Sequence, residues 1–169
     1  MSPELIPLDT ATLESLVEGR HGEAEYRLGV RIPAGWPDDN DVAFLRLRLG
    51  QLRGDPARDE WPVHALVVGR ELVGHAGYHG PPGANALGAA DAVEVGYTVF
   101  EPHRGRGHAT AAVRELVARA RERGAARVLA SIAPDNAPSL AVVSKLGFRH
   151  VDEVGDEEDG RELVFELRI

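Results

Sequence analysis

The chain contains no cysteine and a single lysine, Lys145, among its 169 residues. Without cysteine it forms neither disulfide bridges nor thiolate metal sites. No apolar run approaches the roughly 18 residues that a membrane-spanning helix needs, so no membrane partner is expected. The first residues lack the basic segment and following apolar segment of a secretory signal, which predicts a cytoplasmic location.

Positive charge is also scarce. The chain has 19 arginine and lysine residues against 27 aspartates and glutamates, which gives a net charge of −8. A general nucleic-acid-binding protein presents a basic face, so nucleic acid is not an expected partner. The acidity aids solubility and also suits a cationic partner such as an amine.

The residues that are present favour one globular domain. Apolar residues make up 43% of the chain, its length allows one proper core, and no linker or repeat divides residues 1–169. The patterns predict an α+β fold with one mixed sheet. Strands are expected at 4–8, 63–68, 71–78, 93–100, 127–133, 148–154 and 161–169, and helices at about 10–19, 41–53, 107–123 and 136–146. The segment 21–40 gives no clear pattern, and an acidic turn over 155–160 joins the last two strands.

A glycine-rich turn, Arg104-Gly105-Arg106-Gly107-His108-Ala109, lies between an expected strand and a long amphipathic helix. Glycines let backbone N–H groups approach a ligand closely, and the start of the helix behind them carries partial positive charge. Together these features predict a pyrophosphate site. A dinucleotide-binding fold is the competing interpretation. It is disfavoured because Thr110 holds the position of its third glycine and no acidic residue ends a strand about 20 residues later.

Three further motifs accompany this turn: Glu94-Val95-Gly96-Tyr97, Asn136-Ala137-Pro138-Ser139 and Lys145-Leu146-Gly147-Phe148. Together with the turn they resemble the GNAT superfamily of N-acetyltransferases, and most of all its ribosomal-protein N-acetyltransferase branch. The resemblance is specific over about residues 63–167, and residues 1–62 are compatible with the part where this superfamily builds its acceptor site. It implies the GNAT fold, an α+β domain whose mixed, mostly antiparallel sheet is splayed between its fourth and fifth strands and flanked by helices.

The resemblance also implies acetyl-CoA as the cosubstrate. Its pantetheine arm would lie in the gap of the sheet and pair with the backbone near Val99 and Phe100. Asn136 would bind the arm or its thioester end, and Ser139 would lie near the sulfur. The alternative for these two is a helix cap and a first-turn serine. The pyrophosphate would contact the turn and the start of the helix, through Arg104, Gly105, Arg106, Gly107, His108, Ala109 and the hydroxyl of Thr110. The side chains of both arginines either bind phosphate or point to solvent.

Acetyl transfer needs the amine in its neutral form. For a lysine-like amine with a pKa near 10.4, deprotonation at pH 7 costs about 4.6 kcal/mol, whereas an α-amino group costs only about 1–1.4 kcal/mol. Glu94 is the candidate base, directly or through water, and His79 is the second candidate. The alternative role for Glu94 is to order the acceptor or to face solvent. Many members of the superfamily carry a tyrosine as general acid where this chain has Val143, so Ser139 either donates a proton to the departing thiolate or only bonds to the sulfur.

These inferences predict an acetyl-CoA-dependent enzyme that transfers an acetyl group directly to a primary amine, either a protein N-terminus or a small molecule. A non-catalytic acyl-CoA-binding module and a transferase for another acyl group, such as succinyl, are the alternatives. A basic pocket near the thioester would favour the latter. No metal is expected, because His75 and His79 have no third ligand at useful spacing, and a homodimer stays open. Trp36, Trp61 and Tyr26 are expected to pack in the core rather than to line an acceptor pocket.

Overall fold

The computed structural model describes residues 2–155 and 160–169. Its sheet has the strand order β1-β2-β3-β4-β5-β7-β6, and every neighbouring pair is antiparallel except β4 and β5, which are parallel. The strands are β1 (Glu4–Pro7), β2 (Val63–Val68), β3 (Glu71–Tyr78), β4 (Ala92–Val99), β5 (Arg127–Ile132), β6 (Arg149–Val154) and β7 (Glu162–Arg168). The predicted mixed sheet is confirmed. The acidic turn expected over 155–160 falls on residues 156–159, which lie outside the described part of the chain.

The described residues form five α-helices, some of which are capped by a side chain at their first turn. They are α1 (Thr10–Val17), α2 (His21–Leu28), α3 (Asp39–Gly54), α4 (His108–Glu122) and α5 (Ala137–Lys145), with short 3-10 helices η1 (Pro56–Glu60) and η2 (Glu101–His103). Asp9 accepts a hydrogen bond of 2.8 Å from the Thr12 N–H at the start of α1, and Asp38 forms a reciprocal capping box with Asp41 in α3. Helix α2 was not predicted. It buries only Ala24 and Leu28, too few residues to produce a recognisable apolar stripe.

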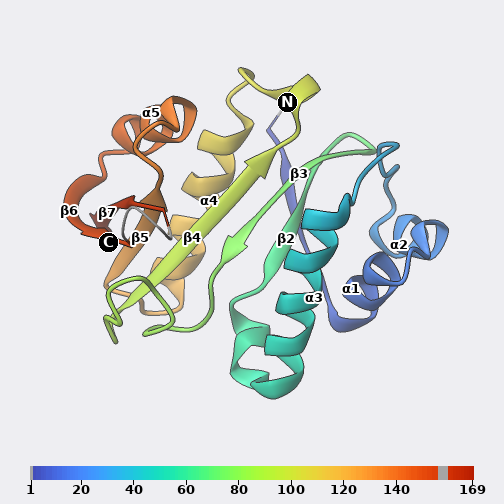
Figure 1. The fold of residues 1–169 in the computed structure, drawn as a ribbon, viewed down its shortest axis with the longest axis horizontal. Coiled ribbons are helices and arrows are strands. Elements are labelled where there is room, and N and C mark those ends of the chain that lie inside the picture. Colours follow the sequence, from blue (N-terminus) through green and yellow to red (C-terminus); the bar gives the residue numbers. More distant parts are fainter. Residues whose placement is uncertain (1, 156–159) are drawn as a thin grey trace.

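The two faces of the sheet are covered by different helices (Figure 1). Helices α1, α2 and α3 gather around β2 and β3 on one face, where Leu16 and Leu45 pack with Ala65 in one core cluster. On the opposite face, Leu116 of α4 packs with Val93 of β4 in the other large cluster. The segment before β2 and the segment after β4 thus form opposite sides of the same sheet, and β3 and β4 separate them.

Strands β4 and β5 pair over only three residues of each strand. Ala92, Val93 and Glu94 lie opposite residues 127–129, and beyond Glu94 strand β4 pairs only with β3. This confirms the predicted splay between the fourth and fifth strands. It leaves one edge of β4 without a strand partner from Val95 onward, which is the edge that faces the gap.

Of the three aromatic residues expected in the core, two are buried. Trp36 and Trp61 are buried, each 6% exposed, but Tyr26 is 89% exposed, so core packing was the wrong expectation for Tyr26. It lies on the outer side of the short helix α2, which buries a different pair of residues.

Within the described residues, no helix has both the length and the apolar character needed to cross a membrane.

Candidate active site

The glycine-rich turn adopts the backbone conformation that its glycines permit. Gly105 and Gly107 have φ values of +73° and +81°, in the left-handed region that residues with a β-carbon rarely adopt. A β-carbon built on either residue would meet no heavy atom within 4 Å. The space in front of both glycines is therefore open, and a ligand can approach the backbone there.

The start of α4 offers a row of free backbone donors. Gly107 is the N-cap residue and no side chain caps the helix. Among the described residues, the N–H groups from His108 to Thr110 have no protein acceptor, as is usual in an uncapped first helical turn. Donors of this kind, with the helix dipole behind them, favour a phosphate group. The residues present therefore fit a pyrophosphate.

The side chains of the turn contribute less than its backbone. Arg104 Nε donates a 3.0 Å hydrogen bond to the carbonyl oxygen of Val99, so this guanidinium is partly used to join the turn to the end of β4. Arg106 is exposed and contacts no carboxylate among the described residues. The His108 side chain is buried, and burial lowers its pKa, with Arg106 acting in the same direction.

The register of β4 decides which backbone groups face the gap in the sheet. The Phe100 N–H donates to the Val73 carbonyl at 2.9 Å, and the His79 N–H donates to the Glu94 carbonyl at 2.9 Å. Because an antiparallel ladder alternates, the backbone groups of residues 95, 97 and 99 point away from β3 and toward the gap. Of the two positions expected to pair with pantetheine, Val99 therefore has its N–H facing the gap and its carbonyl oxygen bonded to Arg104, whereas the Phe100 N–H is bonded to Val73.

The N-terminus of α5 lies across this gap from β4. Asn136 Oδ1 accepts a 3.2 Å hydrogen bond from the Ser139 N–H, so Asn136 caps the helix and keeps its amide nitrogen without a bond to the described residues. The Tyr97 hydroxyl donates to the Ser139 carbonyl oxygen at 3.3 Å, and burial raises the pKa of this tyrosine. Val143, at the position where the resemblance led us to expect a tyrosine as general acid, is fully buried in the core. Tyr97 and Ser139 thus bring two hydroxyl groups to one place.

Glu94 lies at the point where β4 separates from β5, and it is only 2% exposed. Its Oε2 accepts a 2.6 Å hydrogen bond from the Ala86 N–H, and its Oε1 lies 3.6 Å from His79 Nδ1. A β-carbon built on Gly96 would lie 3.1 Å from His79 Nε2, so the tip of the imidazole ring lies over this glycine. Glu94 does not face solvent, and the half-exposed His79 shields it on the open side.

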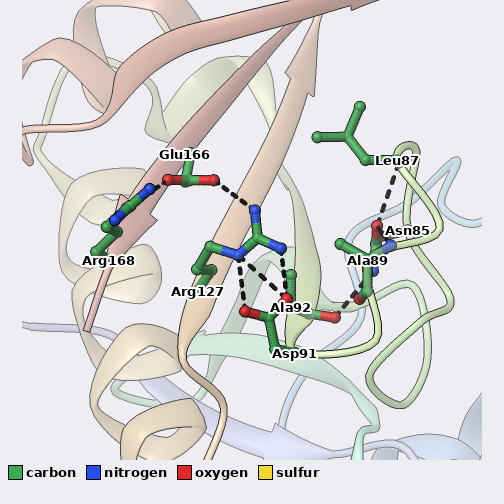
Figure 2. Close-up of polar contacts among 8 residues, drawn as sticks. All are labelled: Asn85, Leu87, Ala89, Asp91, Ala92, Arg127, Glu166 and Arg168. Carbon is green, nitrogen blue, oxygen red and sulfur yellow. Dashed lines mark hydrogen bonds and ion pairs between the residues drawn. The ribbon is translucent and has the colours of Figure 1, made fainter.

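A loop between β3 and β4 holds Glu94 in place, and its own polar contacts fix it (Figure 2). Asn85 Nδ2 donates to the carbonyl oxygens of Ala89 and Ala92, both at 2.9 Å, and its Oδ1 accepts from the Ala89 N–H at 3.0 Å. This network orders the loop on either side of Ala86. The backbone donor that holds the Glu94 carboxylate is therefore part of a fixed loop.

The end of the same loop is fastened to the sheet. Figure 2 shows the Arg127 guanidinium between Asp91, the last residue before β4, and Glu166 of β7. Its Nη1 donates to Glu166 Oε2 at 2.8 Å. These contacts join β4, β5 and β7 at the end where β4 and β5 still pair, so the gap opens from a fixed base.

A cleft of about 310 Å³ opens beside α3, over β3 and β4. One of its walls is the stacked pair of Phe44 and His75, whose ring centroids lie 5.2 Å apart. The Arg48 guanidinium also lies over the Phe44 ring, 5.1 Å from the ring centroid. The remaining lining residues are Asn40, Asp41, Val63, Gly77, Tyr78, His79, Gly96, Tyr97 and Thr98.

Neither Phe44 nor Arg48 was a predicted site residue. Their spacing on α3 puts them on one helical face, but the same spacing is typical of any helix packed on a sheet. Of the predicted residues, the structure brings His79 and Glu94 together beside this cleft, and Asn136 and Ser139 together across the gap. The glycine turn lies beyond the other end of β4.

Comparison with known proteins agrees with this geometry. Residues 5–149 match the acetyltransferase (GNAT) domain family. The chain belongs to the GNAT acetyltransferases. It is 26% identical over 148 residues to the uncharacterized N-acetyltransferase YjdG of Bacillus subtilis strain 168, a match that covers 83% of this chain and 82% of the relative.

Solved structures of other GNAT proteins share the fold. The ribosomal-protein-alanine N-acetyltransferase of Brucella melitensis superposes with a TM-score of 0.67 at 24% identity, covering 98% of this chain and 99% of the other. The microcin C7 self-immunity acetyltransferase MccE, in complex with acetyl-CoA and AMP, superposes with a TM-score of 0.66 at 14% identity, covering 99% and 93%. At these identities the likeness is one of fold.

Membership of the GNAT family confirms the predicted family, fold and cosubstrate, since GNAT enzymes use acetyl-CoA. It also confirms the general class of acyl-CoA-dependent N-acyl transfer. Within that class, the uncapped start of α4 and the open gap beside Val99 are the features of this chain that suit the pyrophosphate and the pantetheine arm.

Proposed function

We propose that this GNAT protein transfers the acetyl group of acetyl-CoA directly to a primary amine that enters the cleft beside α3. The observation that carries the proposal is the position of the cleft. It opens over residues 96–98 of β4. One edge of this same strand faces the gap in the sheet that is proposed to hold the cofactor. An amine in the cleft and a thioester in the gap can therefore meet at β4.

The proton of the attacking amine has a path through His79. This residue lines the cleft, and burial lowers its pKa, so the imidazole is mainly neutral at pH 7 and can accept a proton. Glu94 Oε1, 3.6 Å from Nδ1, would stabilise the imidazolium that forms. We infer that His79 contacts the amine and that Glu94 positions and supports it, which reverses the order of the two candidates expected from the sequence.

The departing thiolate needs only a modest proton donor, because a thiol has a pKa of about 8.5. As the amine nitrogen bonds to the carbonyl carbon and the carbon–sulfur bond breaks, the sulfur takes a proton from a nearby hydroxyl, and that hydroxyl regains a proton from solvent when the products leave. Ser139 keeps its predicted role as a candidate. Tyr97 is the second candidate, because its hydroxyl lies 3.3 Å from the Ser139 carbonyl oxygen and Val143 carries no hydroxyl.

The test is acetyl transfer itself. Purified protein is mixed with acetyl-CoA and a panel of primary amines, and thiol release and acetylated amine are both measured. We expect equal amounts of the two products with at least one amine. Binding of CoA without amine-dependent thiol release from any amine would favour the acyl-CoA-binding module instead. Release with succinyl-CoA but not with acetyl-CoA would favour the other acyl group.

A further inference from the structure

The cleft beside α3 contains a cationic group, Arg48, that forms no ion pair with a carboxylate among the described residues. Arg48 Nη1 donates to Gln51 Oε1 at 2.9 Å and to the His79 carbonyl oxygen at 3.0 Å, both of them neutral acceptors. Its Nε is buried and has no partner among the described residues. Its Nη2 also has no such partner, and it is not among the buried unpartnered atoms, so it keeps some exposure to solvent on a residue that lines the cleft.

The surroundings of Arg48 increase its need for an anion. Arg58 Nη1 donates to the same His79 carbonyl oxygen at 2.8 Å, so two guanidinium groups converge on one oxygen. Half-burial lowers the pKa of Arg48, with Arg58 acting in the same direction. The Glu94 carboxylate acts in the opposite direction, but it forms no ion pair with Arg48, and its Oε2 accepts a hydrogen bond from the Ala86 N–H. A half-buried cation without a paired charge is costly, and a bound anion would relieve that cost.

The two charged residues of α3 that line the cleft give its two ends opposite charges. Asp41 and Arg48 both line it, and seven residues on one helix place their backbones about 10 Å apart. Asp41 is engaged in the capping box, where its Oδ2 accepts from the Asp38 N–H at 3.1 Å. An anionic ligand is repelled at the Asp41 end and attracted at the Arg48 end. Phe44 and His75 form an apolar wall between the two ends.

We propose that Arg48 binds a carboxylate of the acceptor, so that the amines this protein acetylates are amino acids or amino-acid-like compounds rather than polyamines or peptide N-termini. The proposal rests on the proposed function and names the substrate class of that site. The other source of a carboxylate would be a dicarboxylic acyl group on CoA. The acceptor is the better fit, because Arg48 belongs to α3 and bonds to the carbonyl oxygen of His79, just after β3, away from the gap between β4 and β5.

The experiment compares acids with their neutral analogues. Acetyl transfer is measured with L-leucine, L-methionine and L-phenylalanine, with the carboxamide of each, and with a short peptide that has the same N-terminal residue. We expect kcat/KM for the acid to exceed that for the carboxamide by about tenfold or more, the usual worth of a charge-assisted hydrogen bond. In Arg48→Gln the preference should fall to about twofold or less, mainly through KM, because residue 48 then carries no charge with which to distinguish a carboxylate from a carboxamide.

Two further variants keep the result interpretable. Arg46→Gln removes an exposed arginine of the same helix that does not line the cleft, and it should leave the preference unchanged. Arg48→Lys keeps a positive charge in case Arg48→Gln fails to fold, and it should retain part of the preference. Equal rates for acid and carboxamide in the wild type, a better peptide substrate, or an unchanged preference in folded Arg48→Gln would each overturn the proposal.

Varying the acyl donor and the acceptor distinguishes the two sources of the carboxylate. A preference for succinyl-CoA over acetyl-CoA that disappears in Arg48→Gln would move the carboxylate from the acceptor to the acyl group and overturn the acceptor assignment. CoA binding with no transfer to any amine would contradict the proposed function on which this inference rests. Transfer to polyamines with no transfer to amino acids would leave the proposed function standing and overturn only the inference about Arg48.

Discussion

The proposed cofactor side and the proposed acceptor side of this protein are built from different kinds of atoms. On the proposed cofactor side, the groups available to a ligand are mostly backbone groups, at the start of α4 and along the free edge of β4. On the acceptor side they are side chains, supplied by α3 and by the end of β3. A backbone site recognises a group that never changes, the pyrophosphate and amide arm of CoA. A side-chain site can be altered residue by residue for a new amine.

The residues of the two sides also matter for different reasons, their backbone conformation on one side and their side-chain chemistry on the other. Gly105 and Gly107 matter because only glycine adopts their backbone angles easily. Phe44, Arg48 and His79 matter because of the groups they carry. Substitutions on the two sides should therefore fail differently, with lost cofactor binding on one side and altered rate or selectivity on the other.

The largest effect is expected on the cofactor side. Gly107→Asp puts a β-carbon at a φ of +81° and a negative charge beside the pyrophosphate site, and should weaken CoA binding by about a hundredfold or more. Calorimetry on the folded variant measures this. Gly107→Ala is the control, because it adds the strain without the charge and should lose less affinity. Unchanged affinity in folded Gly107→Asp would remove the turn from the cofactor site.

On the acceptor side, the next largest effect is expected from removing the proposed base, His79. His79→Gln should lower kcat for a lysine-like amine by about a hundredfold at pH 7, within the usual range for a general base. The loss should shrink as the pH rises toward the pKa of the amine, where no base is needed. In the wild type, activity should fall as the pH drops below the His79 pKa, which lies below its ordinary value of 6.5, because the protonated ring no longer accepts a proton.

Glu94→Gln is the matched variant for this path. If Glu94 acts through His79, its loss should cost about tenfold in kcat, less than His79→Gln, because the base itself remains. A pH–rate profile of His79→Gln that parallels the wild type would exclude His79 as the base. A larger loss in Glu94→Gln than in His79→Gln would return that role to Glu94.

The sequence predicted the glycine turn, the helix that follows it and most of the sheet, for a physical reason. Glycines with positive φ and a helix start leave a recognisable pattern in the sequence, and strands 63–68 and 71–78 were predicted with their observed bounds. The splay was expected only through the family resemblance. Local patterns do not show where two distant strands stop pairing, and here they stop at Glu94.

The acceptor side was predicted poorly because its site depends on tertiary contacts. Phe44 and Arg48 have the spacing of any buried helical face, and nothing in the sequence shows that His75 stacks on Phe44 or that His79 covers Glu94. Helix α2 buries too few residues to reveal itself, and Tyr26 looked like a core residue although it is exposed. Tyr97 belongs to the motif Glu94-Val95-Gly96-Tyr97, but only the folded structure shows that its hydroxyl reaches the Ser139 carbonyl oxygen.

A smaller effect is expected where the two sides meet, at the sulfur. Ser139→Ala should lower kcat by roughly ten- to a hundredfold with little change in CoA affinity, since a charge-assisted bond to the thiolate contributes about 1–3 kcal/mol. Tyr97→Phe provides the comparison, because it removes only a hydroxyl. If Tyr97 is the donor, its variant should be the slower of the two. Full rate in both variants would show that the thiolate leaves without a proton donor from this protein.

The smallest effect should come from the exposed arginine of the turn. If the backbone carries most of the pyrophosphate binding, Arg106→Gln should weaken CoA binding by no more than about fivefold, the usual worth of an exposed ion pair. Added salt should shrink even this difference, because exposed charges are screened within about 10 Å at 0.1 M ionic strength. Calorimetry at two salt concentrations, with Gly107→Asp measured in parallel, gives both numbers. A loss from Arg106→Gln as large as that from Gly107→Asp would show that side chains bind the cofactor as well, and that the contrast between a backbone site and a side-chain site is false.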